Sequence, residues 1–174
     1  TLATDRERAT LIEAALEKAG APDHTFIWAM VETPVAMLHC EEIAAASERL
    51  AVLVMGTNDL VKELYAEHVP GRQPLLPGLG LALLAARATG KVVLDGVYND
   101  FNDTKGFEAT CHTARNCGFD GKTLIHPSQI GPANRIEPGG PDQGQPTHFV
   151  VGRGWGTIAI KVPKDFGDKK LTWT

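Results

Sequence analysis

Short apolar runs alternate with amphipathic stretches along most of the chain. Patterns typical of β-strands cover residues 25–31, 50–55, 91–95 and 119–125. Patterns typical of helices cover residues 5–18, 40–49, 58–66, 79–89 and 104–117. Strands separated by helices at intervals of about 30 residues predict parallel βα units with right-handed crossovers. The strands are apolar over most of their length, as expected when both faces of a sheet are covered.

The pattern changes after Asn134. Residues 138–146 consist only of Pro, Gly, Gln and Asp, a composition typical of a linker. Beyond them, His148–Ile160 and Lys170–Trp173 have β-like patterns with no helix between them. We therefore expect one domain over residues 1–135, and a Pro/Gly linker with a β-like tail over residues 136–174.

Composition narrows the class of protein. The chain has 174 residues, of which 43% are hydrophobic and 22% charged, values of an ordinary globular domain but fewer residues than a complete (β/α)₈ barrel needs. A net charge of −4 favours neither nucleic acid nor a membrane surface as a partner. No apolar run approaches the length of a bilayer-spanning helix, and the first residues lack a signal-peptide pattern. The cysteines, Cys40, Cys111 and Cys117, show no metal or disulfide spacing, which predicts a reducing, cytoplasmic location.

Two acidic residues follow consecutive predicted strands. Glu32 comes directly after the strand at 25–31, and Asp59 closes a Gly-Thr-Asn-Asp turn after the strand at 50–55. The carboxyl ends of parallel strands lie side by side, on the face where α/β active sites form. Paired carboxylates there suit a hard divalent cation such as Mg²⁺. On spacing alone, Glu32 could instead act like an N-cap before Pro34, and Asp59 could cap a helix.

Four stretches together resemble the CitE-like branch of the HpcH/HpaI aldolase/citrate lyase superfamily, which includes the citrate lyase β subunit and malyl-CoA lyases. They are Met30–Pro34, Gly56–Leu60, Leu94–Phe101 and Gly118–Ile130, and the last is the most specific. The resemblance covers about residues 1–135. Since the family fold is a (β/α)₈ barrel, it implies an α/β chain forming a partial TIM barrel, roughly strands five to eight, followed by an unrelated β-like C-terminal tail.

The resemblance also implies a function. Glu32 and Asp59 correspond to the family's Mg²⁺ ligands. The expected enzyme is a Mg²⁺-dependent lyase that cleaves citryl-CoA, malyl-CoA or a related 3-hydroxyacyl-CoA in a reversible Claisen-type reaction, as a homo-oligomer. Segments near the strand ends correspond to the walls of the acyl-CoA channel and give further candidate contacts: Pro34, Asp95, Tyr98, Asn99, His126 and Pro127.

Three of these candidates have a structural alternative. Asp95 could cap a turn, Tyr98 could pack in the core, and His126 could be hydrogen-bonded into the rim of the barrel. Of their neighbours, Lys122 could attract a CoA phosphate, but a solvated or strand-end lysine is the favoured interpretation. Asp100 and Asp103 are expected to cap the helix that follows, and Cys111 and Cys117 to pack as small residues.

Two alternative functions stay open. One is a pyruvate-type class II aldolase, which acts on hydroxy-oxo acids without CoA. The Asp-Gly-Val-Tyr-Asn-Asp segment at 95–100 and the His-Pro-Ser-Gln-Ile segment at 126–130 favour the CoA-dependent branch. The other is an inactive half-barrel, because the family's phosphate-binding basic residues and substrate-holding Arg belong to the first half of the barrel.

Overall fold

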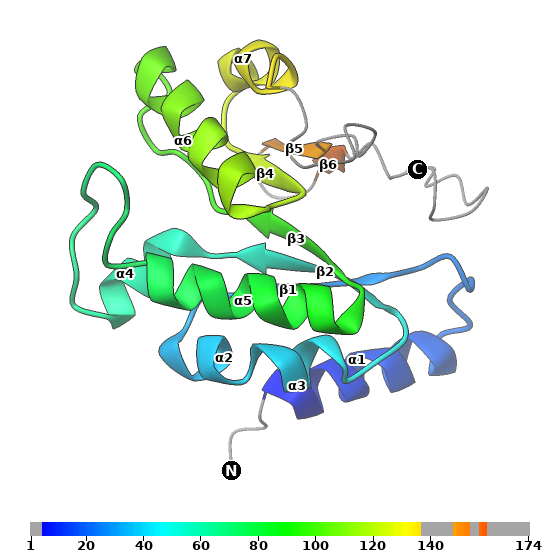
Figure 1. Cartoon of the computed structure of the whole chain (residues 1–174). Helices are drawn as coiled ribbons and strands as arrows, with labels where there is room; N and C mark the ends of the chain where they lie inside the picture. Colours follow the sequence, from blue (N-terminus) through cyan, green and yellow to red (C-terminus); the bar gives the residue numbers. More distant parts are fainter. Residues whose placement is uncertain (1–4, 137–147, 154–156, 160–174) are drawn as a thin grey trace.

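The computed structural model describes residues 5–136, 148–153 and 157–159, and it centres on a single six-stranded sheet (Figure 1). The strands follow chain order, from β1 to β6. β1 to β5 are parallel, and β6 is antiparallel to β5. The strands are β1 (Ile27–Val31), β2 (Leu50–Met55), β3 (Val92–Asp95), β4 (Gly121–Leu124), β5 (His148–Arg153) and β6 (Thr157–Ala159).

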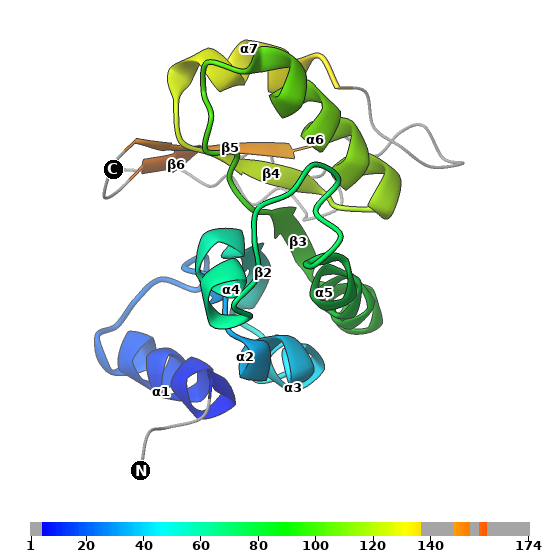
Figure 2. The same cartoon turned by 90° about the vertical axis from the view of Figure 1, so that its left-hand side faces the viewer.

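Helices connect the parallel strands, which confirms the predicted βα alternation. They are α1 (Asp5–Lys18), α2 (Pro34–Leu38), α3 (Cys40–Ala44), α4 (Thr57–Glu63), α5 (Leu76–Thr89), α6 (Thr104–Cys117) and α7 (Ile130–Asn134), with a short 3₁₀ turn at Pro127–Gln129. α1, α2, α3 and α5 gather at the β1–β3 end of the sheet, and α6 and α7 at the β4–β5 end (Figure 1 and Figure 2).

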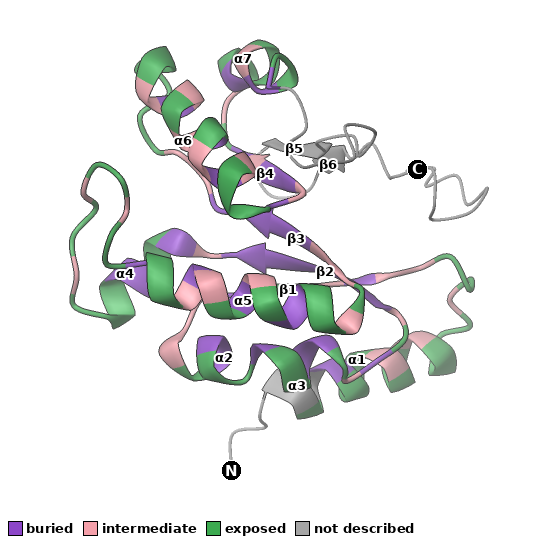
Figure 3. Cartoon of the chain, viewed as in Figure 1, coloured by how far each residue is buried: buried purple, intermediate pink, exposed green. Residues whose placement is uncertain are grey.

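The two faces of the sheet carry different apolar clusters. One face packs against helices: Leu53 and Val93 join a buried cluster with Leu79 and Ala82 of α5. The other face carries Val52, Val54 and Leu94, against which Phe26, Trp28 and Val92 pack. Successive side chains of a strand point to opposite faces, so this division follows directly from the alternation along β2 and β3. Figure 3 colours the described residues by burial, and β2 is buried along its whole length.

The helix predicted at 40–49 is shorter than expected. The structure places two short helices, α2 and α3, in this part of the chain, and α3 ends at Ala44. Thr33 begins α2 as its N-cap, because its hydroxyl accepts a hydrogen bond from Ala36 N at 3.1 Å. Ser47 then turns the chain into β2, since its hydroxyl accepts from Arg49 N at 3.0 Å. Local side-chain bonds to the backbone therefore replaced the predicted last turns of the helix.

The Pro/Gly-rich loop before α5 is exposed over most of its length and buried at its C-terminal end. α5 begins at Leu76 rather than Leu79, with Pro77 in its first turn, where proline is favoured. Leu75 is 2% exposed, and Arg72, with a left-handed φ of 55°, donates to Asp95 at the end of β3. The loop is thus anchored to the core at its C-terminal end.

The predicted β-like character of the tail is confirmed within the described residues. β5 lies along β4, with His148 opposite Gly121 and Val151 opposite Leu124, so it extends the sheet beyond the fourth parallel strand. Residues 170–173 fall outside the described part of the chain. The domain boundary near residue 135 stays a prediction. In the described part of the chain, no helix has the length and apolarity needed to cross a membrane.

Candidate metal site at the carboxyl ends of the strands

Glu32 and the turn after β2 are brought together by the register of the first two strands. Val31 lies opposite Met55, and Gly56 N donates to Val31 O at 2.9 Å. The Glu32 side chain then lies over Gly56, where an added Cβ would come 2.6 Å from Glu32 Oε2. Glycine is needed here because any side chain would displace the carboxylate.

Neither acid caps a helix, so the capping alternative is wrong. Thr33 caps α2, and the N-cap of α4 is Gly56, with Asp59 inside the first turn of that helix. An acidic residue in this turn is compatible with the helix dipole. Both carboxylates remain accessible, since Glu32 is half-buried and Asp59 is exposed.

The two carboxylates share one environment. Burial, then the charge of Asp59, then a side-chain hydrogen bond with Asp59 raise the pKa of Glu32 above its ordinary value. Like charges placed so close disfavour each other, and a divalent cation between them would relieve the repulsion. The described residues hold no group of three or more His, Cys, Asp or Glu suited to a metal. A cation bound by this pair alone would keep several positions for water and substrate, as Mg²⁺ usually does.

Asp95 lies in a different environment, on the helix-covered face of the sheet. It stands opposite Lys122 in the parallel register of β3 and β4 and is 0% exposed. Its carboxylate accepts from Arg72 Nη1 at 2.6 Å and from Lys122 Nζ at 2.7 Å. Burial would raise the pKa of Asp95, but the adjacent Lys122 and Arg72 charges lower it overall. With both oxygens bound to cations, Asp95 anchors the loop before α5 to the sheet.

Of the alternatives for Lys122, a solvated side chain is wrong, because its side chain is 1% exposed within β4. The register of β3 and β4 is the signal that would have paired it with Asp95. Arg72 carried no such signal, since it comes from a loop 23 residues before Asp95.

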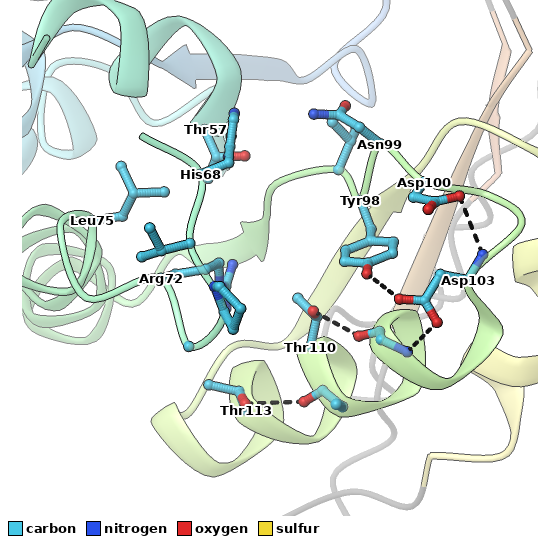
Figure 4. Close-up of a pocket in the computed structure, with 16 residues that line it drawn as sticks. Thr57, His68, Arg72, Leu75, Tyr98, Asn99, Asp100, Asp103, Thr110 and Thr113 are labelled. Carbon is cyan, nitrogen blue, oxygen red and sulfur yellow. Dashed lines mark hydrogen bonds between the residues drawn. The ribbon is translucent and has the colours of Figure 1, made fainter. Parts of the chain in front are cut away.

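A cavity of about 470 Å³ opens between the loop before α5 and helix α6 (Figure 4). Of the predicted contacts, Tyr98 and Asn99 line it. Tyr98 packs against Phe107, and its hydroxyl donates to Asp103 at 2.7 Å, which raises the pKa of Tyr98 to about 12. Asp103 caps α6 as predicted, accepting from Gly106 N at 2.9 Å. Asp100 instead accepts from Asn102 N within the turn before the helix.

The other predicted contacts lie outside the lining of this cavity. His126 Nδ1 is 2.7 Å from Ser128 Oγ, and its ring stacks on Phe101 at 4.6 Å, so it is held in the rim. Pro34 begins α2, and Pro127 begins the 3₁₀ turn. Of the two cysteines expected to pack, Cys111 is buried but Cys117 is exposed.

Comparison with known proteins identifies the family. Residues 4–127 match the HpcH/HpaI aldolase/citrate lyase family model. The chain belongs to this family. The resemblance found in the sequence is therefore confirmed. The partial barrel is confirmed by a structure of the citrate lyase β subunit from M. tuberculosis, which superimposes with a TM-score of 0.58 at 31% identity.

Curated relatives cover the same part of the chain. A (3S)-malyl-CoA thioesterase of Cereibacter sphaeroides is 56% identical over 110 residues, which are 63% of this chain and 38% of that protein. The citrate lyase subunit beta of Escherichia coli K12 is 39% identical over 109 residues, 63% of this chain and 36% of that protein. The chain thus spans less than half the length of these relatives.

Several solved relatives carry ligands, and one of them holds both magnesium and an oxo acid. The M. tuberculosis citrate lyase beta subunit complexed with oxaloacetate and magnesium is 33% identical, with a TM-score of 0.57, over 69% of this chain and 55% of that one.

Proposed function

We propose that this chain carries the metal-binding half of a Mg²⁺-dependent carbon–carbon lyase that acts on a 3-hydroxyacyl-CoA of the malyl or citryl type. The observation that carries the proposal is the meeting of Glu32 and Asp59 at the carboxyl ends of β1 and β2. The magnesium and oxaloacetate in a structure of a related citrate lyase β subunit support the ion and the oxo-acid product.

The donor set fits Mg²⁺. Glu32 and Asp59 supply two hard oxygen donors with a charge of −2, and their mutual repulsion falls when a cation binds between them. When bound, such an ion polarises a carbonyl oxygen and orients the substrate.

The chain's own residues position this site. Gly56 lets Glu32 lie across the turn, and Thr57 and Leu60 are buried beneath Asp59, at 3% and 1% exposure. At the end of β3, Arg72 and Lys122 hold Asp95 in place. The carboxylates are thus held on strand ends rather than on a free loop, which favours a constant geometry for cleavage.

A second function is favoured by a specific comparison. The malyl-CoA relative at 56% identity is named a thioesterase, whereas the citrate lyase relative shares 39%. Hydrolysis of the thioester gives free CoA thiol and a hydroxy acid, but lyase cleavage gives an oxo acid and a shorter acyl-CoA. Both reactions use the same substrate class, so the products distinguish them.

The deciding experiment assays the full chain with Mg²⁺ on a panel of hydroxyacyl-CoA thioesters and free hydroxy-oxo acids. Release of an oxo acid from a CoA substrate supports the lyase, and release of free thiol supports the thioesterase. Turnover restricted to free hydroxy-oxo acids would identify a class II aldolase. Mg²⁺ binding without turnover on any substrate would fit the half-barrel alternative.

Metal binding is tested separately by calorimetry. We expect Glu32→Gln and Asp59→Asn each to lower Mg²⁺ affinity by at least about tenfold, because each removes a charged ligand. Glu63→Gln is the matched control, since Glu63 is an exposed acid at the end of the same helix as Asp59. Equal affinities in all three variants and the parent chain would refute the metal site.

A further inference from the structure

Two asparagine side chains join the segments that follow β2 and β3. Asn58 Nδ2 donates to Asn99 Oδ1 at 3.0 Å, and Asn99 Nδ2 donates to Asn58 Oδ1 at 2.8 Å. Each amide therefore acts as donor and acceptor toward the other, which fixes orientation as well as distance. We call this pair the amide clasp. It spans 41 residues of sequence and lies at the exposed rim of the sheet.

The Asn99 side of the clasp belongs to a segment that the core holds in place. Lys122 Nζ donates to Gly96 O, and Thr123 Oγ1 donates to Asp95 O at 3.1 Å. A Cβ on Gly96 would come 2.7 Å from Met55 O, so the ends of β2 and β3 are already in contact beneath the clasp. Asn99 comes shortly after this contact in the chain, so its backbone is held in a fixed position.

The Asn58 side carries the candidate metal ligand. Asn58 directly precedes Asp59 in the first turn of α4, and both are exposed, whereas Thr57 and Leu60 anchor the buried side of the turn. The exposed side of the turn also feels repulsion between the Asp59 and Glu32 carboxylates when no cation is bound. On this exposed side of the turn, the clasp adds a link to the β3–α6 connection, beside the side-chain hydrogen bond between Glu32 and Asp59.

We infer that Asn58 and Asn99 are positioning residues for Asp59. The inference rests on the proposed metal site and assigns neither amide to the ion or the substrate. The clasp locks the first turn of α4 to the β3–α6 connection, so that Asp59 is already directed at Glu32 before a cation arrives. Preorganisation of this kind strengthens binding, because less ordering remains when the ion binds. It also gives Asn99 a role different from the channel contact that the family resemblance suggests.

The test is a double-mutant cycle on Mg²⁺ affinity, measured by calorimetry on the full chain. Asn58→Ala and Asn99→Ala are each expected to lower affinity by about tenfold, the lower range for residues that support metal ligands. The double variant should lose no more than either single variant, because all three lack the same clasp. Asn116→Ala is the matched control, since Asn116 is an exposed asparagine at the end of α6 and should leave affinity unchanged.

Melting temperature without metal separates positioning from folding. A drop in melting temperature with unchanged Mg²⁺ affinity would mean a purely structural pair and would overturn the inference. Additive losses in the double variant would also overturn it, because the two amides would then act independently. If Glu32→Gln loses Mg²⁺ binding while both clasp variants keep it, the positioning role of the clasp is refuted and the proposed metal site is supported. If Glu32→Gln binds Mg²⁺ as the parent chain does, both fail.

Discussion

A single buried carboxylate connects three parts of this chain. Asp95 on β3 holds Arg72 from the loop before α5 and Lys122 from β4, and all of its side chain is removed from water. Arg72 reaches it from a left-handed backbone conformation, which is unfavourable for a residue with a side chain. Two cations compensate the burial of this acid, so the stability of the region depends on Asp95 keeping its charge.

Asp95→Asn should destabilise the chain by about 3–5 kcal/mol, because it leaves Lys122 and Arg72 without their shared anion. Urea unfolding at pH 7 measures the effect. Glu108→Gln is the control: Glu108 pairs with Arg135 at the surface, and such pairs contribute about 0–1 kcal/mol. A loss from Asp95→Asn no larger than that of the control would contradict this account.

Asp95 also makes the stability of the chain depend on pH in the acid range. The pKa of Asp95 is lower in the folded than in the unfolded chain, so its contribution is complete above the unfolded value of about 4. As pH falls through the folded pKa, the carboxyl group is protonated and the contribution is lost. The difference in unfolding free energy between the parent chain and Asp95→Asn should therefore shrink below about pH 4. A difference in unfolding free energy that stays constant down to pH 2 would contradict a stabilising role for the charged Asp95 carboxylate.

At the scale of elements, glycines control how closely the strand ends approach. Gly96 follows β3 directly, and the side chain of Thr57 and the carbonyl of Met55 occupy the space where its Cβ would lie. Gly80 lies within α5, where an added Cβ would meet nothing within 4 Å. The same substitution thus has opposite consequences in the two elements.

Gly96→Ala should destabilise the chain by about 1–3 kcal/mol, because backbone has to move to make room. Gly80→Ala should stabilise it by about 0.5–1 kcal/mol, since alanine is the better helix former. Thermal unfolding of both variants compares the signs directly. Destabilisation by both, or stabilisation by both, would show that the packing around one of these glycines differs from the structure.

At the scale of the whole molecule, the edge strands of the sheet determine whether the chain can associate with another copy. β5 covers the side of β4, and within the described residues β1 pairs with β2 alone. An edge strand with free backbone groups invites pairing with another chain, and Met30 on β1 is 56% exposed. At the other end of the sheet, β6 pairs with β5 alone within the described residues, so the described sheet has two edge strands.

We predict that the 174-residue chain self-associates through β1. Sedimentation should show association that rises with concentration, and Met30→Lys should reduce it, because a charge on an edge strand opposes pairing. Leu38→Lys is the control, since Leu38 is 74% exposed on α2, away from the strand edge. A monodisperse monomer over the full concentration range would refute the prediction.

The alternation of apolar runs and helical patterns was enough to predict four parallel strands joined by helices, because periodicity is local and the crossovers follow from chain connectivity. The strand-end positions of Glu32 and Asp59 were likewise readable from their place after apolar runs. The role of Lys122 could not be predicted from the sequence pattern, because burial of a lysine depends on which charges surround it. The role of Arg72 could not be predicted either, because it reaches Asp95 from a loop with no periodic pattern. The amide clasp could not be predicted from the sequence either. Its two asparagines are 41 residues apart and meet only once the register of β2 and β3 is fixed. Periodicity records how each segment divides its residues between core and solvent, whereas pairs of polar groups are set by distances that exist only in the folded chain.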